Sequence, residues 1–164
     1  MDASGALKLS ALSRRPVHLL IDASTGTLHL GHQYLLIIIP FGRVALQDPT
    51  QFIFDRAFEA LAIRGFRVDN NNAAFAPTVR LQLEDLSVTA YDLLFTRRLR
   101  ASIKLSLTTA SADDTPLLHC SAQSEESTFA RFGFAPQLTQ VLQRALDKAL
   151  NEVLSCADGS MRRT

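Results

Sequence analysis

Two neighbouring stretches decide the fold of this chain: VRLQLEDLSVTA at residues 79–90 and LRASIKLSL at residues 99–107. In the second stretch, apolar side chains occupy every odd position from Leu99 to Leu107, and polar side chains occupy the positions between them. Side chains of a β-strand point alternately to its two faces, so this pattern predicts a strand with one buried and one solvent-facing side.

The first stretch changes the parity of its pattern halfway. Its apolar residues are odd-numbered up to Leu83 and even-numbered from Leu86 onward. Because one extra residue in a strand returns the following side chains to the same face, we predict a β-bulge near Glu84 and Asp85.

After a turn at residues 111–115 the alternation resumes, which predicts a third strand and a three-stranded antiparallel meander. Closing the hairpin at Ala112 and Asp113 gives the expected pairs: Leu107 with Leu118, Leu105 with Cys120, Ile103 with Ala122, and on the outer face Arg100 with Glu125.

Two more strands are expected near the N-terminus. Residues 17–23 alternate loosely, and residues 34–39 are continuously apolar until Pro40. A continuous run is typical of a strand covered on both faces, although periodicity does not separate it from a buried helix.

Two helices complete the expected elements. The first begins with Asp48 as N-cap and Pro49 in the first turn, has Gln51 in a capping box, and ends at Gly65. The second runs from Pro136 to about Cys156. The expected apolar stripe of the first helix comprises Ile53, Phe54, Ala57, Phe58 and Leu61.

The order of these elements, β-β-α-β-β-β-α, predicts an α+β fold. We expect one domain at residues 17–157, with an antiparallel or mixed sheet of four to five strands and two helices packed on one face. Residues 1–16 are expected to be a flexible lead-in and residues 158–164 a C-terminal tail.

The composition narrows the function classes. With 164 residues, 47% of them hydrophobic, the chain is long enough for one domain with its own core. Its net charge of +1 lacks the strongly basic footprint of nucleic-acid-binding domains, so we expect no nucleic-acid partner. No apolar run approaches the roughly 20 residues that span a bilayer.

The chain also lacks the common catalytic and cofactor motifs, such as G-x-S-x-G, G-x-G-x-x-G, H-E-x-x-H and C-x-x-C. His29 and His32 are three residues apart, but no third metal ligand lies near them in the sequence. We therefore predict a protein that is not an enzyme and needs no cofactor or metal. An enzyme with a dispersed site would instead require a pocket that holds a histidine beside a carboxylate.

The two cysteines, Cys120 and Cys156, both fall on predicted inward faces. Two buried free thiols are the default expectation. A disulfide is the alternative if the last helix crosses the sheet there and the compartment is oxidising.

One end of the predicted sheet collects aromatic and basic residues. The turn after the first meander strand reads YDLLFTRR at residues 91–98, whereas turns usually carry Gly, Asn, Asp or Pro. Antiparallel pairing brings the end of the third strand to the same edge. We expect either an amphipathic binding patch for anionic lipids or a partner protein, or aromatic rings that plug the open end of the core. The candidate patch comprises Tyr91, Leu93, Leu94, Phe95, Arg97, Arg98, Phe129, Arg131, Phe132 and Phe134.

Three segments, LAIRGFRV at 61–68, PTVRLQLEDLSVTAYDLLF at 77–95 and PQLTQVLQRALDKALNEVL at 136–154, give the chain a family resemblance. In their order and pattern, residues 17–154 resemble the YajG-like family of bacterial envelope lipoproteins. The wider group includes the lipopolysaccharide-assembly lipoprotein LptE and the activator lipoproteins of peptidoglycan synthases.

The resemblance implies a non-catalytic periplasmic domain, anchored to the outer membrane through an N-terminal acylated cysteine. The first cysteine here is Cys120, so we expect the anchor to lie outside these residues. The implied partner is an envelope protein or an anionic lipid or glycan. The alternative is a protein–protein module of a secretion or appendage complex that uses a sheet edge. The oligomeric state stays open.

Overall fold

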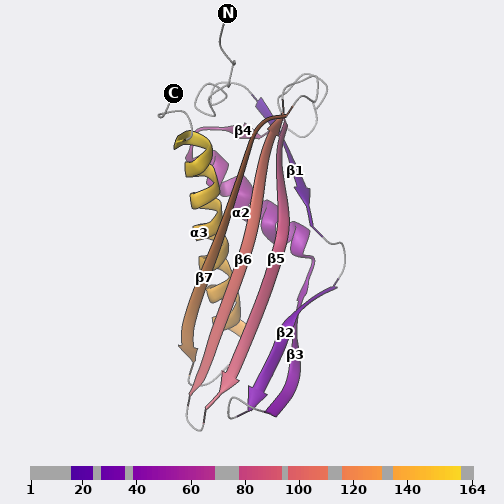
Figure 1. Ribbon diagram of the computed structural model, residues 1–164, viewed down its shortest axis with the longest axis vertical. Coiled ribbons are helices and arrows are strands. Elements are labelled where there is room, and N and C mark those ends of the chain that lie inside the picture. Colours follow the sequence, from indigo (N-terminus) through magenta and orange to yellow (C-terminus); the bar gives the residue numbers. More distant parts are fainter. Residues whose placement is uncertain are drawn as a thin grey trace, which may run out of the picture.

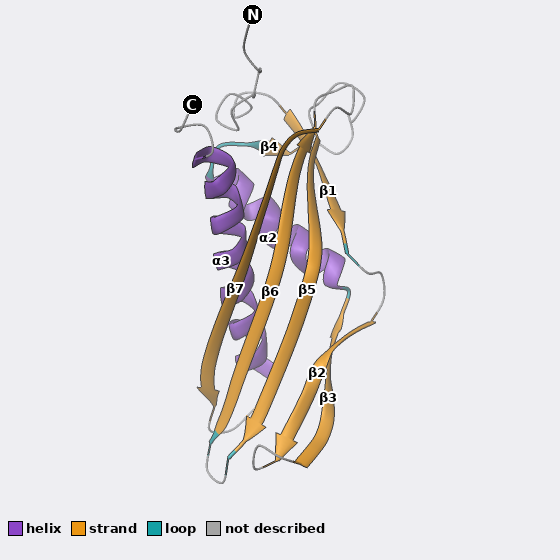
Figure 2. Cartoon of the chain, in the orientation of Figure 1, coloured by secondary structure: helices purple, strands orange, loops and turns teal. Residues whose placement is uncertain are grey.

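The computed structural model describes residues 16–23, 27–35, 39–68, 78–93, 96–110, 116–130 and 135–159. A tall, twisted mixed sheet is covered on one face by two helices (Figures 1 and 2). This confirms the predicted α+β class, but the sheet has seven strands rather than four to five. The elements are β1 (Pro16–Asp22), β2 (Thr27–Leu35), β3 (Ile39–Gln47), α2 (Pro49–Ile63), β4 (Arg67–Val68), β5 (Thr78–Asp92), β6 (Arg97–Ala110), β7 (Pro116–Ala130) and α3 (Ala135–Gly159).

Strands β5, β6 and β7 form the predicted antiparallel meander. The register between β5 and β6 shifts between Leu83 and Asp85, which confirms the predicted bulge. As a result Leu81, Leu86 and Val88 are all buried on the helix-covered face. The parity change in the sequence is therefore explained by this one irregularity.

The predicted pairing of β6 with β7 is wrong by two residues. Leu107 pairs with Cys120 and Leu105 pairs with Ala122, and the register is irregular between Thr109 and Ala110. A slip of two residues keeps every side chain on its predicted face. The sequence pattern therefore identified the buried residues correctly but could not fix their partners.

The other edge of β5 is shared by two strands that both run parallel to it. β1 pairs along the first part of β5, from His18 opposite Thr78 to Asp22 opposite Gln82. β2 pairs with the last part, where Gln33 lies opposite Ala90. The short strand β4 lies beside β1 on its far side.

Glycine is required where β2 approaches β5. A Cβ atom at Gly31 would lie 2.0 Å from the carbonyl oxygen of Val88, and the φ of Gly31 is +155°. A side chain there would collide with backbone rather than with a flexible group. Gly31 is therefore the residue that allows the hairpin of β2 and β3 to join the sheet.

The single strand expected at residues 34–39 is wrong. The run includes the end of β2 and the start of β3, which are antiparallel, with Tyr34 opposite Pro40; residues 36–38 lie outside the described residues. Pro40 lies within β3 and does not end it. β3 is the edge strand on that side of the sheet, and an edge strand tolerates a residue that has no N–H to donate.

Helix α2 begins at Pro49 as predicted, but its cap differs. Asp48 adopts a left-handed conformation with φ of 53° and makes no side-chain cap bond. The Gln51 amide donates instead to the Asp55 carboxylate at 2.7 Å, so the predicted capping box is wrong. At the other end Gly65 has φ of 84°, which agrees with the predicted C-terminal signal.

The predicted apolar stripe of α2 is too wide. Ile53, Ala57 and Leu61 are buried, whereas the Phe58 side chain is 45% exposed. Phe58 lies outside the arc that faces the sheet and stacks on Phe54, with ring centroids 6.3 Å apart. Its burial prediction is therefore wrong.

Helix α3 supplies the other half of the core and extends three residues beyond the predicted end at Cys156. Its apolar face packs on β6 and β7. Ala145, Leu146 and Val153 are fully buried there, and the Ser124 hydroxyl of β7 donates to the Ala145 carbonyl oxygen. The helix is thus held to the sheet by apolar packing and by a buried hydrogen bond.

A disulfide joins Cys120 of β7 to Cys156 near the end of α3, with Cα atoms 6.1 Å apart. The default expectation of two free thiols is therefore wrong. The reason is the path of α3, which carries its C-terminal part over the first part of β7, a geometry that the sequence does not specify.

Candidate functional site

The residues of the predicted patch that the structure describes lie at the end of the sheet where β5 and β7 finish and β6 begins (Figure 1). Tyr91 belongs to β5, Arg97 and Arg98 to β6, and Phe129 to β7. Leu93 lies in the turn, where its N–H donates to the Thr96 carbonyl oxygen at 2.7 Å. Leu94, Phe95, Arg131, Phe132 and Phe134 lie outside the described residues.

Strand register aligns three of these residues. Tyr91 pairs with Arg98, and Arg98 pairs with Phe129. Residues paired directly across strands point to the same face. That face is the outer one, turned away from the helices, because the neighbouring positions Ala90, Leu99 and Ala130 are the buried ones.

Sequence reasoning missed a fourth member, Tyr34 of β2. Parallel pairing places Tyr34 opposite Tyr91, and the two rings stack with centroids 5.6 Å apart and planes inclined by 23°. We call Tyr34, Tyr91, Arg98 and Phe129 the sheet-end row. A tyrosine that begins an otherwise aliphatic run was the only signal for Tyr34, because its partner lies far away in the sequence.

The row continues as a chain of ring contacts. The Arg98 guanidinium lies 5.9 Å from the centroid of the Phe129 ring, a cation–π distance. His32 lies beside Tyr34, with ring centroids 6.4 Å apart. Phe129 is 66% exposed and Leu93 is 37% exposed, so these two apolar side chains do not plug the core.

The charges around the row are mostly neutralised. Arg97, a member of the predicted patch, forms an ion pair with Asp92. Arg100 forms an ion pair with Glu125 at 2.5 Å, as predicted, although it does so diagonally because Arg100 pairs in register with Ser127. The hydrogen bond from Arg100 lowers the pKa of the Glu125 carboxyl.

A second cross-strand pair lies further along the same face. Lys104 contacts Glu84 at 2.6 Å, and this hydrogen bond lowers the pKa of the Glu84 carboxyl. Both carboxylates therefore stay ionised at neutral pH.

Arg98 differs from these cations. Within the described residues it forms no ion pair, and its contact is with the Phe129 ring. It acts on Glu125 only at longer range, where its charge also lowers the pKa of that carboxyl. Among the described residues, the row thus presents one positive charge without an ion-pair partner beside three aromatic rings.

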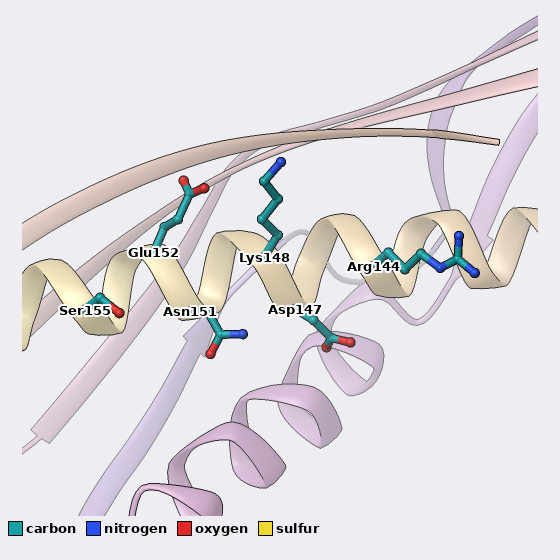
Figure 3. Close-up of a pocket in the computed structure, with 6 residues that line it drawn as sticks. All are labelled: Arg144, Asp147, Lys148, Asn151, Glu152 and Ser155. Carbon is teal, nitrogen blue, oxygen red and sulfur yellow. The ribbon is translucent and has the colours of Figure 1, made fainter.

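Apart from the sheet-end row, a hollow of about 460 Å³ on the outer side of α3 is a second candidate site (Figure 3). Its side chains diverge: Lys148 and Glu152 point toward β7, while Asp147 and Asn151 point toward α2. Lys148 pairs with Glu126 at 3.3 Å, and Asp147 lies 3.8 Å from Arg56. Because Lys148 and Asp147 are already paired with charges on β7 and α2, and the lining side chains do not converge, this surface is a weaker candidate than the sheet-end row.

Among the helices that the structure describes, none is both long enough and apolar enough to pass through a membrane.

The comparisons with known proteins find a shared fold. No protein-family model and no curated protein matches the chain. Among solved structures it is similar to the protein XCC0632 from Xanthomonas campestris, of the family DUF330, with a TM-score of 0.56 and 11% identity over 90% of this chain and 87% of that one.

Two further similar structures are bacterial lipoproteins. One is a minor lipoprotein from Acinetobacter baumannii (TM-score 0.49, 8% identity, 89% of this chain and 92% of that one). The other is the rare lipoprotein B from Shewanella oneidensis (TM-score 0.49, 10% identity, 89% of this chain and 97% of that one). At these identities the comparisons show the fold and leave the function to the residues of this chain.

Proposed function

We propose that this protein is a non-catalytic domain of the bacterial cell envelope that binds an envelope component through the sheet-end row. The observation that carries the proposal is the row itself, which places three aromatic side chains, and one guanidinium that has no ion pair with any described residue, on the face that the core does not use. Aromatic residues and arginine are the side chains that most often dominate binding surfaces.

The disulfide supports an envelope location. Cys120 and Cys156 are joined, and disulfides persist in oxidising compartments such as the bacterial periplasm. The resemblance of residues 17–154 to the YajG-like lipoproteins points to the same compartment. The proposal therefore includes a periplasmic domain held at the outer membrane by an N-terminal lipid.

Cell fractionation tests the location. The complete gene product, expressed in its host with labelled palmitate, should appear in the outer-membrane fraction and carry the label. Recovery of an unlabelled protein from the cytoplasm would contradict this part of the proposal.

Two double variants test the site. Arg98→Glu with Phe129→Asp changes the sheet-end row, whereas Arg80→Glu with Ser121→Asp makes the same change in charge on the outer face near its opposite end. All four positions are exposed, so both variants should fold, which circular dichroism checks.

The readout is co-sedimentation with isolated cell envelopes. We expect the sheet-end variant to bind at least about tenfold less, which corresponds to 1.4 kcal/mol of binding free energy, and the control to bind like the parent. Equal binding by both variants would refute the sheet-end row as the site.

A free sheet edge favours a second candidate function, a module that binds protein by strand addition. Within the described residues β7 pairs only with β6, which leaves one edge of a 15-residue strand open. An added strand would gain main-chain hydrogen bonds and would depend little on the sheet-end side chains. Envelope proteins that stay bound to the sheet-end variant but are lost from Gln123→Pro would support this candidate.

A further inference from the structure

The sheet-end row has the dimensions of an extended ligand. Its members come from four adjacent strands, β2, β5, β6 and β7, at one level of the sheet. With strands about 4.8 Å apart, the row is about 14 Å long. It lies across the strands on an open sheet face, so it is suited to a ligand that lies flat on it.

The rings suit sugar rings better than acyl chains. The Tyr34 and Tyr91 rings are stacked on each other at a shallow angle, and both side chains are partly buried. A pyranose ring has an apolar face of C–H groups that buries well against an aromatic side chain, while its hydroxyls stay in contact with polar groups at the rim. An acyl chain would gain most from an apolar groove, which a sheet face does not provide.

Polar side chains lie beside the row at the next level of the sheet. Thr89 pairs with Arg100, and Arg100 pairs with Ser127. Thr89 and Ser127 can each donate and accept a hydrogen bond, as ligands rich in hydroxyl groups require. Ser102 lies one level further along the same face, and the Gln123 amide, another level beyond, lies 3.5 Å from its hydroxyl.

The single cation of the row suits a ligand whose negative charges are few and well separated. Arg97 and Arg100 are paired with Asp92 and Glu125, whereas Arg98 forms no ion pair within the part of the chain that the structure describes. An anionic membrane attracts proteins through several unpaired basic residues, each contributing about 1 kcal/mol. One guanidinium among neutral rings instead complements a single carboxylate, which it can bind in a two-pronged contact.

We infer that the sheet-end row binds a glycan chain that carries carboxylate groups. Its sugar rings stack on Tyr34, Tyr91 and Phe129, and one of its carboxylates pairs with Arg98. This inference rests on the proposed function and names the chemical class of its ligand.

Two soluble glycans of equal length test it by titration calorimetry. One is the peptide-free glycan strand of peptidoglycan, whose alternate sugars carry a carboxylate, and the other is a neutral chitin oligosaccharide. We expect the folded parent protein to bind the acidic chain at least about tenfold more tightly. Equal affinity for both chains, or binding of neither, would overturn the inference.

Three single variants assign the roles. Arg98→Gln should abolish the preference for the acidic chain and leave the weaker binding of the neutral chain unchanged. Phe129→Ala should weaken the binding of both chains, since it removes an exposed stacking ring without disturbing the core. Arg80→Gln, an exposed arginine outside the row, should change neither, and a loss there equal to that of Arg98→Gln would overturn the assignment to Arg98.

Vesicles of anionic phosphatidylglycerol separate this inference from the proposed function. If the sheet-end variant loses envelope binding but the parent binds vesicles and neither glycan, the glycan inference fails and the site stands. If envelope binding is unchanged in that variant, both fail.

Discussion

The two faces of the meander formed by β5, β6 and β7 are built from the same strands but are held in place differently. On the helix-covered face, Leu99, Leu105 and Leu107 are fully buried beneath α3. On the outer face of the same strand, Arg100 and Lys104 are exposed and bind carboxylates of neighbouring strands. Burial of apolar area stabilises the first face, while exposed ion pairs contribute little to stability.

This difference shows which face of the sheet can carry a binding site without loss of stability. Substitutions on the helix-covered face disturb the whole core, whereas the outer face can change its side chains with little effect on folding. The sheet-end row lies on the outer face. Its aromatic side chains are therefore better explained by a ligand than by the core.

The largest expected effect is on the buried face. Leu105→Ala removes a fully buried side chain and should lower the free energy of unfolding by about 2–5 kcal/mol. Its matched control, Ser102→Ala, changes the outer side of the same strand and should stay within about 0.5 kcal/mol of the parent. Chemical denaturation measures both, and similar losses would erase the distinction between the faces.

Removal of the disulfide should have the next largest effect. Cys120→Ser with Cys156→Ser opens a cross-link between residues 36 apart and should lower the free energy of unfolding by about 3–4 kcal/mol. The reductant dithiothreitol should destabilise the parent similarly and leave the double variant unchanged. A parent whose unfolding midpoint does not respond to reductant would contradict the bond.

Gly31→Ala tests whether the hairpin of β2 and β3 depends on the close approach to β5. The added Cβ must displace the Val88 carbonyl oxygen, and such overpacking costs about 1–3 kcal/mol. The loss should be local, with faster amide hydrogen exchange in β2 and β3 and unchanged exchange in β6 and β7. Accelerated exchange across the whole meander would show that the hairpin is part of the core.

The smallest expected effect concerns the charge pairs of the outer face. Lys104 and Arg100 lower the pKa of Glu84 and Glu125, so these carboxylates stabilise the fold above the unfolded pKa of about 4.3, and the contribution is lost as the pH falls through the lower folded pKa. Glu84→Gln with Glu125→Gln should reduce the loss of stability below that pH. An unchanged acid unfolding curve would show that the pairs do not matter.

The sequence predicted those features that depend on local alternation. The buried positions of β6 and the bulge beside Glu84 follow from side-chain periodicity alone, and both are confirmed. The two-residue register error between β6 and β7 left the faces intact, so no hydrophobic pattern could reveal it.

Features that depend on distant segments were missed, as Tyr34 was, or given only as the alternative, as the disulfide was. Tyr34 joins the sheet-end row through parallel pairing of β2 with β5, and Cys156 reaches Cys120 because of the path of α3. Such contacts leave no periodic trace in the sequence. Three of the four members of the sheet-end row were therefore predicted from the sequence, and Tyr34, which stacks on Tyr91, was not.

The sharing of one edge of β5 by β1 and β2 has a consequence for how the chain acquires its fold. The meander and α3 are contiguous in the sequence, whereas β1 and the hairpin of β2 and β3 can join β5 only after α2 has been made. Closing long loops is slow, so we expect the C-terminal elements to assemble first and the N-terminal strands to dock last. As the chain emerges from its N-terminus, β1 and the hairpin of β2 and β3 are made before β5, the strand that both must join, and we expect exposure to aggregation to be greatest in that interval.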